Sequence, residues 1–139
     1  MKVTICKAKH TLPIPLFIST VAAGFPSPAE DYIDDALDLN QLLVSHPAAT
    51  FFVRVQGTSM QGANIHSGDV LVVDRALEPK HRAIIIAVLN GEFTVKRVLK
   101  QGKRLFLAPE NPSYPPIEVR EGEEFQVWGV VTYVIHKAK

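Results

Sequence analysis

A serine that follows a sharp-turn signal is the first residue that could carry out chemistry. Residues 50–56 form a β-branched and aromatic run, and Gly57, Thr58 and Ser59 come directly after it. Because glycine allows a sharp bend, consecutive backbone N–H groups after it can point at one oxyanion. A glycine two residues before a serine also occurs in ordinary loops. This segment alone therefore does not establish a nucleophile, and a partner base is required.

A lysine in a later run is the candidate partner of this serine. In residues 92–98, strict alternation places Thr94, Lys96 and Val98 on one face of a strand. If this face points inward, burial lowers the pKa of the lysine and leaves a neutral amine. A neutral amine within hydrogen-bond reach of a serine hydroxyl can act as a general base. The alternative is a lysine whose stem lies on the core while its ammonium group reaches water.

The elements expected around these two residues are short strands. Turn formers separate runs rich in β-branched and aromatic residues, and Asn90-Gly91 between two of them predicts a tight hairpin. The expected strands are residues 50–56, 69–74, 83–89, 92–99, 104–108, 117–120 and 125–135. No helix-length periodic segment lies among them, so we expect a mostly β fold, a compact β-barrel or sandwich. The one predicted helix covers residues 34–45 and is ended by Pro47.

Size and composition limit the protein to one domain and exclude several kinds of site. The 139 residues are enough for one hydrophobic core. With 15 basic and 14 acidic residues the net charge is +1, which gives no electrostatic reason for the whole chain to bind nucleic acid or membranes. Cys6 is the only cysteine, which excludes an internal disulfide and a cysteine zinc site and fits a reducing compartment. The five histidines lack metal-ligand spacing, so we expect no metal and no other cofactor.

Charge and proline content divide the chain near residue 48. Residues 1–23 carry basic residues and no acid, whereas residues 24–48 carry acidic residues and neither lysine nor arginine. Prolines at positions 13, 15, 26 and 28 favour an extended backbone there. We therefore expect an extended N-terminal arm over residues 1–48 and a β-domain over residues 49–139.

The N-terminus has some features of a secretory signal peptide. A basic stretch, an apolar stretch and the small residues Ala22 and Ala23 follow one another. However, Pro13 and Pro15 lie inside the apolar stretch and would prevent the helix that a signal peptide forms there. No run approaches the roughly 20 apolar residues of a membrane span. We therefore expect a cytoplasmic protein that neither is exported nor enters a membrane.

Three motifs follow one another in a fixed order along the chain. They are Gly57-Thr58-Ser59-Met60, then residues 67–74 (SGDVLVVD), then residues 91–97 (GEFTVKR). In this order and spacing they resemble the self-cleaving serine–lysine peptidases of the LexA/UmuD family. Residues 23–29 (AGFPSPA) with Asp31-Tyr32 resemble the cleavage segment of the UmuD branch, and residues 38–42 and 128–131 also match that branch. The resemblance runs from about Leu16 to the C-terminus.

This resemblance implies roles for individual residues. Ser59 would be the nucleophile and Lys96 its general base, and the backbone N–H groups of Thr58 and Ser59 would form the oxyanion hole. The scissile bond would be Ala23–Gly24, where small residues on both sides suit a cleft that brings an extended backbone close to the serine. The protein would then be an autoproteolytic serine endopeptidase.

The resemblance also implies partners. A RecA–single-stranded-DNA filament would stimulate self-cleavage in the SOS response to DNA damage. The shortened homodimer would then join a UmuC-like, Y-family catalytic subunit as the accessory subunit of an error-prone translesion polymerase. Leu16-Phe17 resembles part of the arm motif that contacts the replicative sliding clamp. Docking of the arm would desolvate Lys96, so the filament would act by favouring the docked arm rather than by supplying chemistry.

Two parts of the chain depart from the family pattern. Before the strand expected near residue 84 the family usually shows Gly-Asp, whereas this chain has Arg82-Ala83, which should alter a turn. The first fifteen residues resemble no part of the family.

Three other functions share parts of the pattern. A LexA-type repressor needs a DNA-binding helix-turn-helix domain, and the residues before Gly24 are too few for one. A signal peptidase uses the same serine–lysine chemistry but needs a membrane anchor. A non-catalytic β-domain that serves only as a polymerase accessory stays open, and removal of Ser59 distinguishes it from a peptidase.

Overall fold

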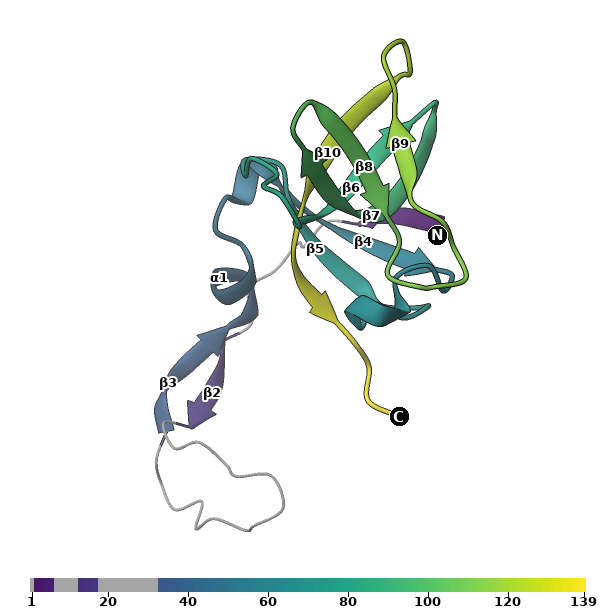
Figure 1. Cartoon of the computed structure of the whole chain (residues 1–139). Helices are drawn as coiled ribbons and strands as arrows, with labels where there is room; N and C mark the ends of the chain where they lie inside the picture. Colours follow the sequence, from purple (N-terminus) through teal and green to yellow (C-terminus); the bar gives the residue numbers. More distant parts are fainter. Residues whose placement is uncertain (1, 7–12, 18–32) are drawn as a thin grey trace.

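The protein folds around one large antiparallel sheet, seen here in a computed structural model that describes residues 2–6, 13–17 and 33–139. The strands of this sheet are β1 (Lys2–Cys6), β4 (Thr50–Gln56), β5 (Val70–Asp74), β6 (Ile84–Leu89), β7 (Glu92–Gln101), β8 (Arg104–Ala108), β9 (Ile117–Val119) and β10 (Phe125–Ile135). Their order is β1-β4-β5-β10-β6-β7-β8-β9 (Figure 1). The mostly β fold expected from the sequence is confirmed. Within the described ranges, no helix is long and apolar enough to cross a membrane.

All the strands predicted from residue 50 onward are present. The bounds of β4, β8 and β10 are those predicted, and β7 runs two residues further because its end pairs with β8, Gln101 opposite Arg104. The hairpin between β6 and β7 turns at Asn90 and Gly91, whose φ angles are 50° and 84°. Two successive positive φ angles match the right-handed twist of the flanking strands, which is why Asn-Gly favours this turn.

The helix predicted over residues 34–45 is wrong in its first half. β3 (Ile33–Asp38) pairs with β2 (Pro13–Phe17) in a two-stranded antiparallel sheet, and α1 covers only Leu39–Leu43. The Asp38 side chain begins the helix by accepting a hydrogen bond from the Asn40 N–H at 3.0 Å. The broken spacing of apolar residues gave a weak helical pattern, and pairing with a distant strand overrides such a pattern.

The start of the chain contributes a strand to the large sheet. β1 pairs with β4 across five register positions, from Lys2 opposite Gln56 to Cys6 opposite Phe52. β1 is therefore the edge strand beyond β4, in a stretch where the family resemblance predicts nothing. In Figure 1 the hairpin of β2 and β3 lies to one side of this sheet, joined to it through α1.

Two clusters of buried side chains form the core, and they lie on opposite faces of β6, since Ile86 belongs to the first and Ile85 and Ala87 to the second. The first comprises Phe51, Val53, Val55, Met60, Ile65, Leu71, Val73, Ile86 and Val95, and the second Ile85, Ala87, Val98 and Leu107. The bend of the sheet comes from β10, which pairs with both β5 and β6 and has register shifts at Val127/Gly129 and Val131/Tyr133. Such bulges sharpen the local twist of a strand. β10 thereby joins the β4–β5 side of the fold to the β6–β7 side.

The turn that departs from the family pattern has an unusual backbone. Arg82 has a φ of 73°, in the left-handed region that favours glycine. The turn is nevertheless tied to β7, because the Arg82 N–H donates to the Val98 carbonyl at 2.8 Å and the Val98 N–H donates to the Ala83 carbonyl at 2.9 Å. The turn thus carries a strained residue and is hydrogen-bonded to Val98, two residues after Lys96.

A close approach of β10 to β5 makes the first testable prediction. A Cβ atom at Gly129 would lie 2.5 Å from Val73 Cγ1 and 3.2 Å from the Asp74 carbonyl oxygen. Gly129→Ala should therefore lower the free energy of unfolding by about 1–3 kcal/mol, measured by urea denaturation. Gln126→Ala, at an exposed position of the same strand, should change it by less than about 0.5 kcal/mol. Equal stability of the two variants would contradict the close approach.

Candidate active site

The serine lies in a turn that a glycine makes possible. β4 ends at Gln56, and Gly57 then adopts a φ of 114°, which side chains with a Cβ rarely allow. Ser59 follows two residues later, and it is only 5% exposed. Met60 follows directly and is fully buried in the first core cluster, so the turn is anchored on the core side.

The lysine lies inside the fold, with its amine at the serine. Lys96 on β7 is 7% exposed, and its Nζ lies 3.3 Å from Ser59 Oγ. The inward orientation is therefore correct, and the alternative of an ammonium group in water is wrong. Burial lowers the pKa of Lys96 below its ordinary value, because removal from water disfavours the charged form. The structure thus brings together the two candidate residues in a partly desolvated contact.

Two further oxygen atoms hold the lysine amine in place. Lys96 Nζ donates to Thr94 Oγ1 at 2.8 Å and to the Val95 carbonyl at 3.0 Å. A neutral amine has two N–H bonds and one lone pair. If those two oxygens take the N–H bonds, the lone pair is left to accept the Ser59 hydroxyl proton. The alternation in the sequence already placed Thr94 on the same face of the strand as Lys96. The position of Thr94 was therefore predictable, but its hydrogen bond to the amine was not.

A loop between β8 and β9 clamps the serine turn from outside. The Asn111 side-chain amide donates to the Thr58 carbonyl at 2.8 Å, and Thr58 Oγ1 lies 3.2 Å from the Tyr114 hydroxyl. The Gly62 N–H donates to the Glu110 carbonyl at 2.6 Å, and a Cβ on Gly62 would clash with that oxygen. Sequence reasoning missed these partners, since they lie about 50 residues from the serine and form no motif with it.

The same loop is tied to the lysine strand. The Arg97 guanidinium forms an ion pair with the Glu110 carboxylate and also donates to the Arg82 carbonyl. Arg97 directly follows Lys96, so the loop that clamps the serine turn is fastened beside the lysine. The serine turn and the lysine strand therefore both contact this loop.

The backbone near the serine offers donors for a developing negative charge. In the part of the chain that the structure describes, the N–H groups of Thr58 and Ser59 donate to no acceptor. Consecutive N–H groups that have no partner of their own can serve an oxyanion. The other two predicted site residues, Ala23 and Gly24, lie outside the described residues.

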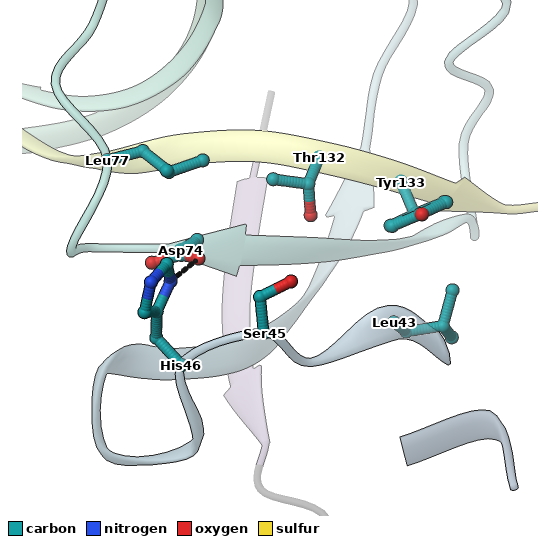
Figure 2. A pocket seen from close by; sticks show the side chains of 7 residues that line it. All are labelled: Leu43, Ser45, His46, Asp74, Leu77, Thr132 and Tyr133. Atoms are coloured by element: carbon teal, nitrogen blue, oxygen red, sulfur yellow. Dashed lines mark hydrogen bonds and ion pairs between the residues drawn. The ribbon is translucent and has the colours of Figure 1, made fainter. Parts of the chain in front are cut away.

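A second serine lies beside a histidine and an aspartate in a separate cavity of about 310 Å³. Its walls are Leu43, Ser45, His46, Asp74, Leu77, Thr132 and Tyr133 (Figure 2). His46 Nδ1 lies 2.6 Å from Asp74 Oδ2, but the Ser45 hydroxyl points away from the histidine ring in Figure 2. The nucleophile–base contact of a Ser-His-Asp triad is therefore missing. Asp74 is in register with Thr50, at the end of β4 opposite to Ser59, so this cavity is distinct from the serine–lysine site.

Comparison with known proteins gives a consistent set of relatives. Residues 15–132 match the model of the Peptidase S24-like family. Protein SamA of Salmonella typhimurium is 51% identical over 125 residues, which cover 90% of this chain and 86% of SamA. Protein ImpA of Escherichia coli is 50% identical over 90% of this chain and 85% of its own. Protein MucA of Escherichia coli is 46% identical over 86% of this chain and 82% of its own.

The buried amine makes a prediction that is independent of activity. Lys96 should titrate at a lower pH in the folded chain than in the unfolded chain, because burial removes water from its amine. At pH values between the pKa of Lys96 in the folded chain and its higher pKa in the unfolded chain, the unfolded state binds more protons than the folded state. Stability should accordingly rise with pH through that window and less so in Lys96→Met. The titration is measured by NMR of the lysine side chains, and coincident Lys96 curves in the folded and unfolded chain would contradict the desolvation.

Proposed function

The chain belongs to the Peptidase S24-like family, and on this basis we propose that Ser59 and Lys96 cleave the chain's own Ala23–Gly24 bond. The family consists of autoproteolytic serine peptidases that use a Ser/Lys pair, and the UmuD-like resemblance predicted from the sequence is confirmed. The observation that carries the proposal is the 3.3 Å contact between Lys96 Nζ and Ser59 Oγ, both of them buried.

The proposed reaction is an acyl transfer followed by hydrolysis. The neutral Lys96 amine takes the hydroxyl proton as Ser59 Oγ attacks the carbonyl carbon of Ala23. The N–H groups of Thr58 and Ser59 stabilise the oxyanion of the tetrahedral intermediate. This intermediate collapses, the bond to the Gly24 nitrogen breaks, and the Lys96 ammonium gives its proton to the leaving amine. Water then attacks the acyl-enzyme with Lys96 again as base, which frees Ser59.

The cellular role follows from the relatives. The similarity to SamA, ImpA and MucA supports the role of a UmuD-like protein in SOS mutagenesis. Residues 24–139 serve, after cleavage, as the accessory subunit of an error-prone Y-family translesion polymerase, in company with a UmuC-like catalytic subunit. A RecA–single-stranded-DNA filament accelerates cleavage in the cytoplasm by favouring the arm docked at Ser59. Leu16 and Phe17 of β2 contribute to sliding-clamp contact.

The homodimer is supported by the surface at the end of β10. Tyr133, Val134 and Ile135 are three consecutive exposed apolar residues. α1 adds the exposed Leu39 and Leu42. Consecutive large apolar residues on a surface indicate an interaction site, and a second copy of the chain is the proposed partner.

Substitution of the two site residues tests the proposed reaction. The purified chain is incubated with and without RecA, nucleotide and single-stranded DNA, and intact mass spectrometry follows residues 1–23 and 24–139. Ser59→Ala and Lys96→Met should each reduce cleavage by at least about 100-fold, because each removes a group that acts in the transition state. Lys103→Met, at an exposed position in the turn between β7 and β8, should cleave like the unaltered chain. Cleavage by Lys96→Met at the unaltered rate, or at a bond other than Ala23–Gly24, would refute the assignment.

A further inference from the structure

In the sequence, the bond assigned to cleavage lies after β1 and β2 and before β3 and β4. β1 and β2 belong to residues 1–23, whereas their partners β4 and β3 belong to residues 24–139. We propose that residues 1–23 stay bound after cleavage, held on the edge of β4 by β1 and on β3 by β2. This inference rests on the proposed function, since it concerns the product of that reaction.

The pairing of β1 with β4 is the principal contact. It spans five register positions, and β5 is the other neighbour of β4, so β1 occupies an edge that no other described strand pairs with. In the register of the two strands, Val3 lies opposite Val55 and Ile5 opposite Val53. Val53 and Val55 of β4 are fully buried. An extended segment added to a sheet edge gains affinity from backbone hydrogen bonds and from alternate side-chain positions. The edge of β4 is thus a strand-addition site for residues 2–6.

The pairing of β2 with β3 is a second, weaker contact. It spans five register positions from Pro13 opposite Asp38 to Phe17 opposite Ile33, with an irregularity before Phe17. β2 and β3 form a sheet of only two strands, and a two-stranded sheet is less stable than a larger one. β3 itself is fixed by continuing into α1 through the Asp38 cap.

The two contacts act together because one fragment carries both strands. Residues 7–12 join β1 to β2, so release of one strand leaves it close to its partner while the other stays bound. Hydrolysis between residues 23 and 24 breaks neither pairing. Loss of the fragment would also expose the edge of β4, and an unpaired edge strand is prone to association with other chains. The immediate product is therefore a nicked protein, whose β4 edge becomes available only when residues 1–23 are removed.

Gel filtration after self-cleavage tests this inference directly. The full chain is allowed to cleave itself, and each eluted fraction is analysed by mass spectrometry under denaturing conditions. Residues 1–23 should co-elute with residues 24–139 at a one-to-one ratio. Thr4→Pro/Ile5→Pro should cause most of the fragment to elute separately. Successive N–H groups point to opposite sides of a strand, so one of these two prolines removes an N–H that donates to β4. Ala8→Pro/Lys9→Pro, outside β1 and β2, should retain the fragment.

A second arm separates this inference from the proposed function. In a Ser59→Ala chain, residues 20–26 are replaced by the recognition sequence of an added protease, which cuts without self-cleavage. Retention of the N-terminal piece after this cut supports the inference even if the unaltered chain never cleaves itself. Separate elution of the piece, with denaturing mass spectrometry showing complete cutting in either arm, overturns it.

Discussion

The contact between a buried amine and a buried hydroxyl constrains the whole molecule. Burial destabilises the charged form of Lys96. The resulting neutral amine can accept the Ser59 hydroxyl proton only if the two groups lie within hydrogen-bond distance. A desolvated lysine is costly, so the surrounding structure must supply both the cover and the oxygen acceptors. The hydroxyl of Thr94 and the carbonyl of Val95 supply those acceptors from the lysine's own strand. The site is therefore built into β7 rather than added to its surface.

The curvature of the sheet makes this contact possible. β4 and β7 are separated in the sheet by β5, β10 and β6, so a flat sheet would keep Ser59 and Lys96 far apart. The bulged strand β10 bends the sheet, and the first core cluster then contains Val55 of β4 as well as Val95 of β7. The same packing that stabilises the fold thus sets the distance between the two candidate catalytic groups. The β8–β9 loop adds a clamp by holding the turn at Thr58 from outside.

Local pattern predicted much of this architecture, and long-range pairing accounts for the rest. Alternating apolar runs and Asn90-Gly91 predicted the strands from residue 50 onward, because a strand or a tight turn is specified by a few adjacent residues. Alternation placed Lys96 on the same strand face as Thr94 and Val98 but did not decide which face points inward, and the structure buries both Val95 and Lys96. The strand at Ile33–Asp38 was mistaken for a helix, since its partner β2 lies far from it in the sequence. The contact of Asn111 with Thr58 was missed for the same reason. Such contacts depend on the folded path of the chain, which periodicity does not encode.

The pH dependence of self-cleavage tests the central claim most directly. The rate of appearance of residues 24–139 is measured from pH 6 to pH 11 without RecA, with Ser59→Ala as the blank. Because the neutral amine is the base and burial lowers the pKa of Lys96, the rate should rise with pH and reach its plateau below the usual lysine range near 10.4. A rate that is independent of pH over this interval, or a Lys96→Met chain with the same profile, would contradict the account.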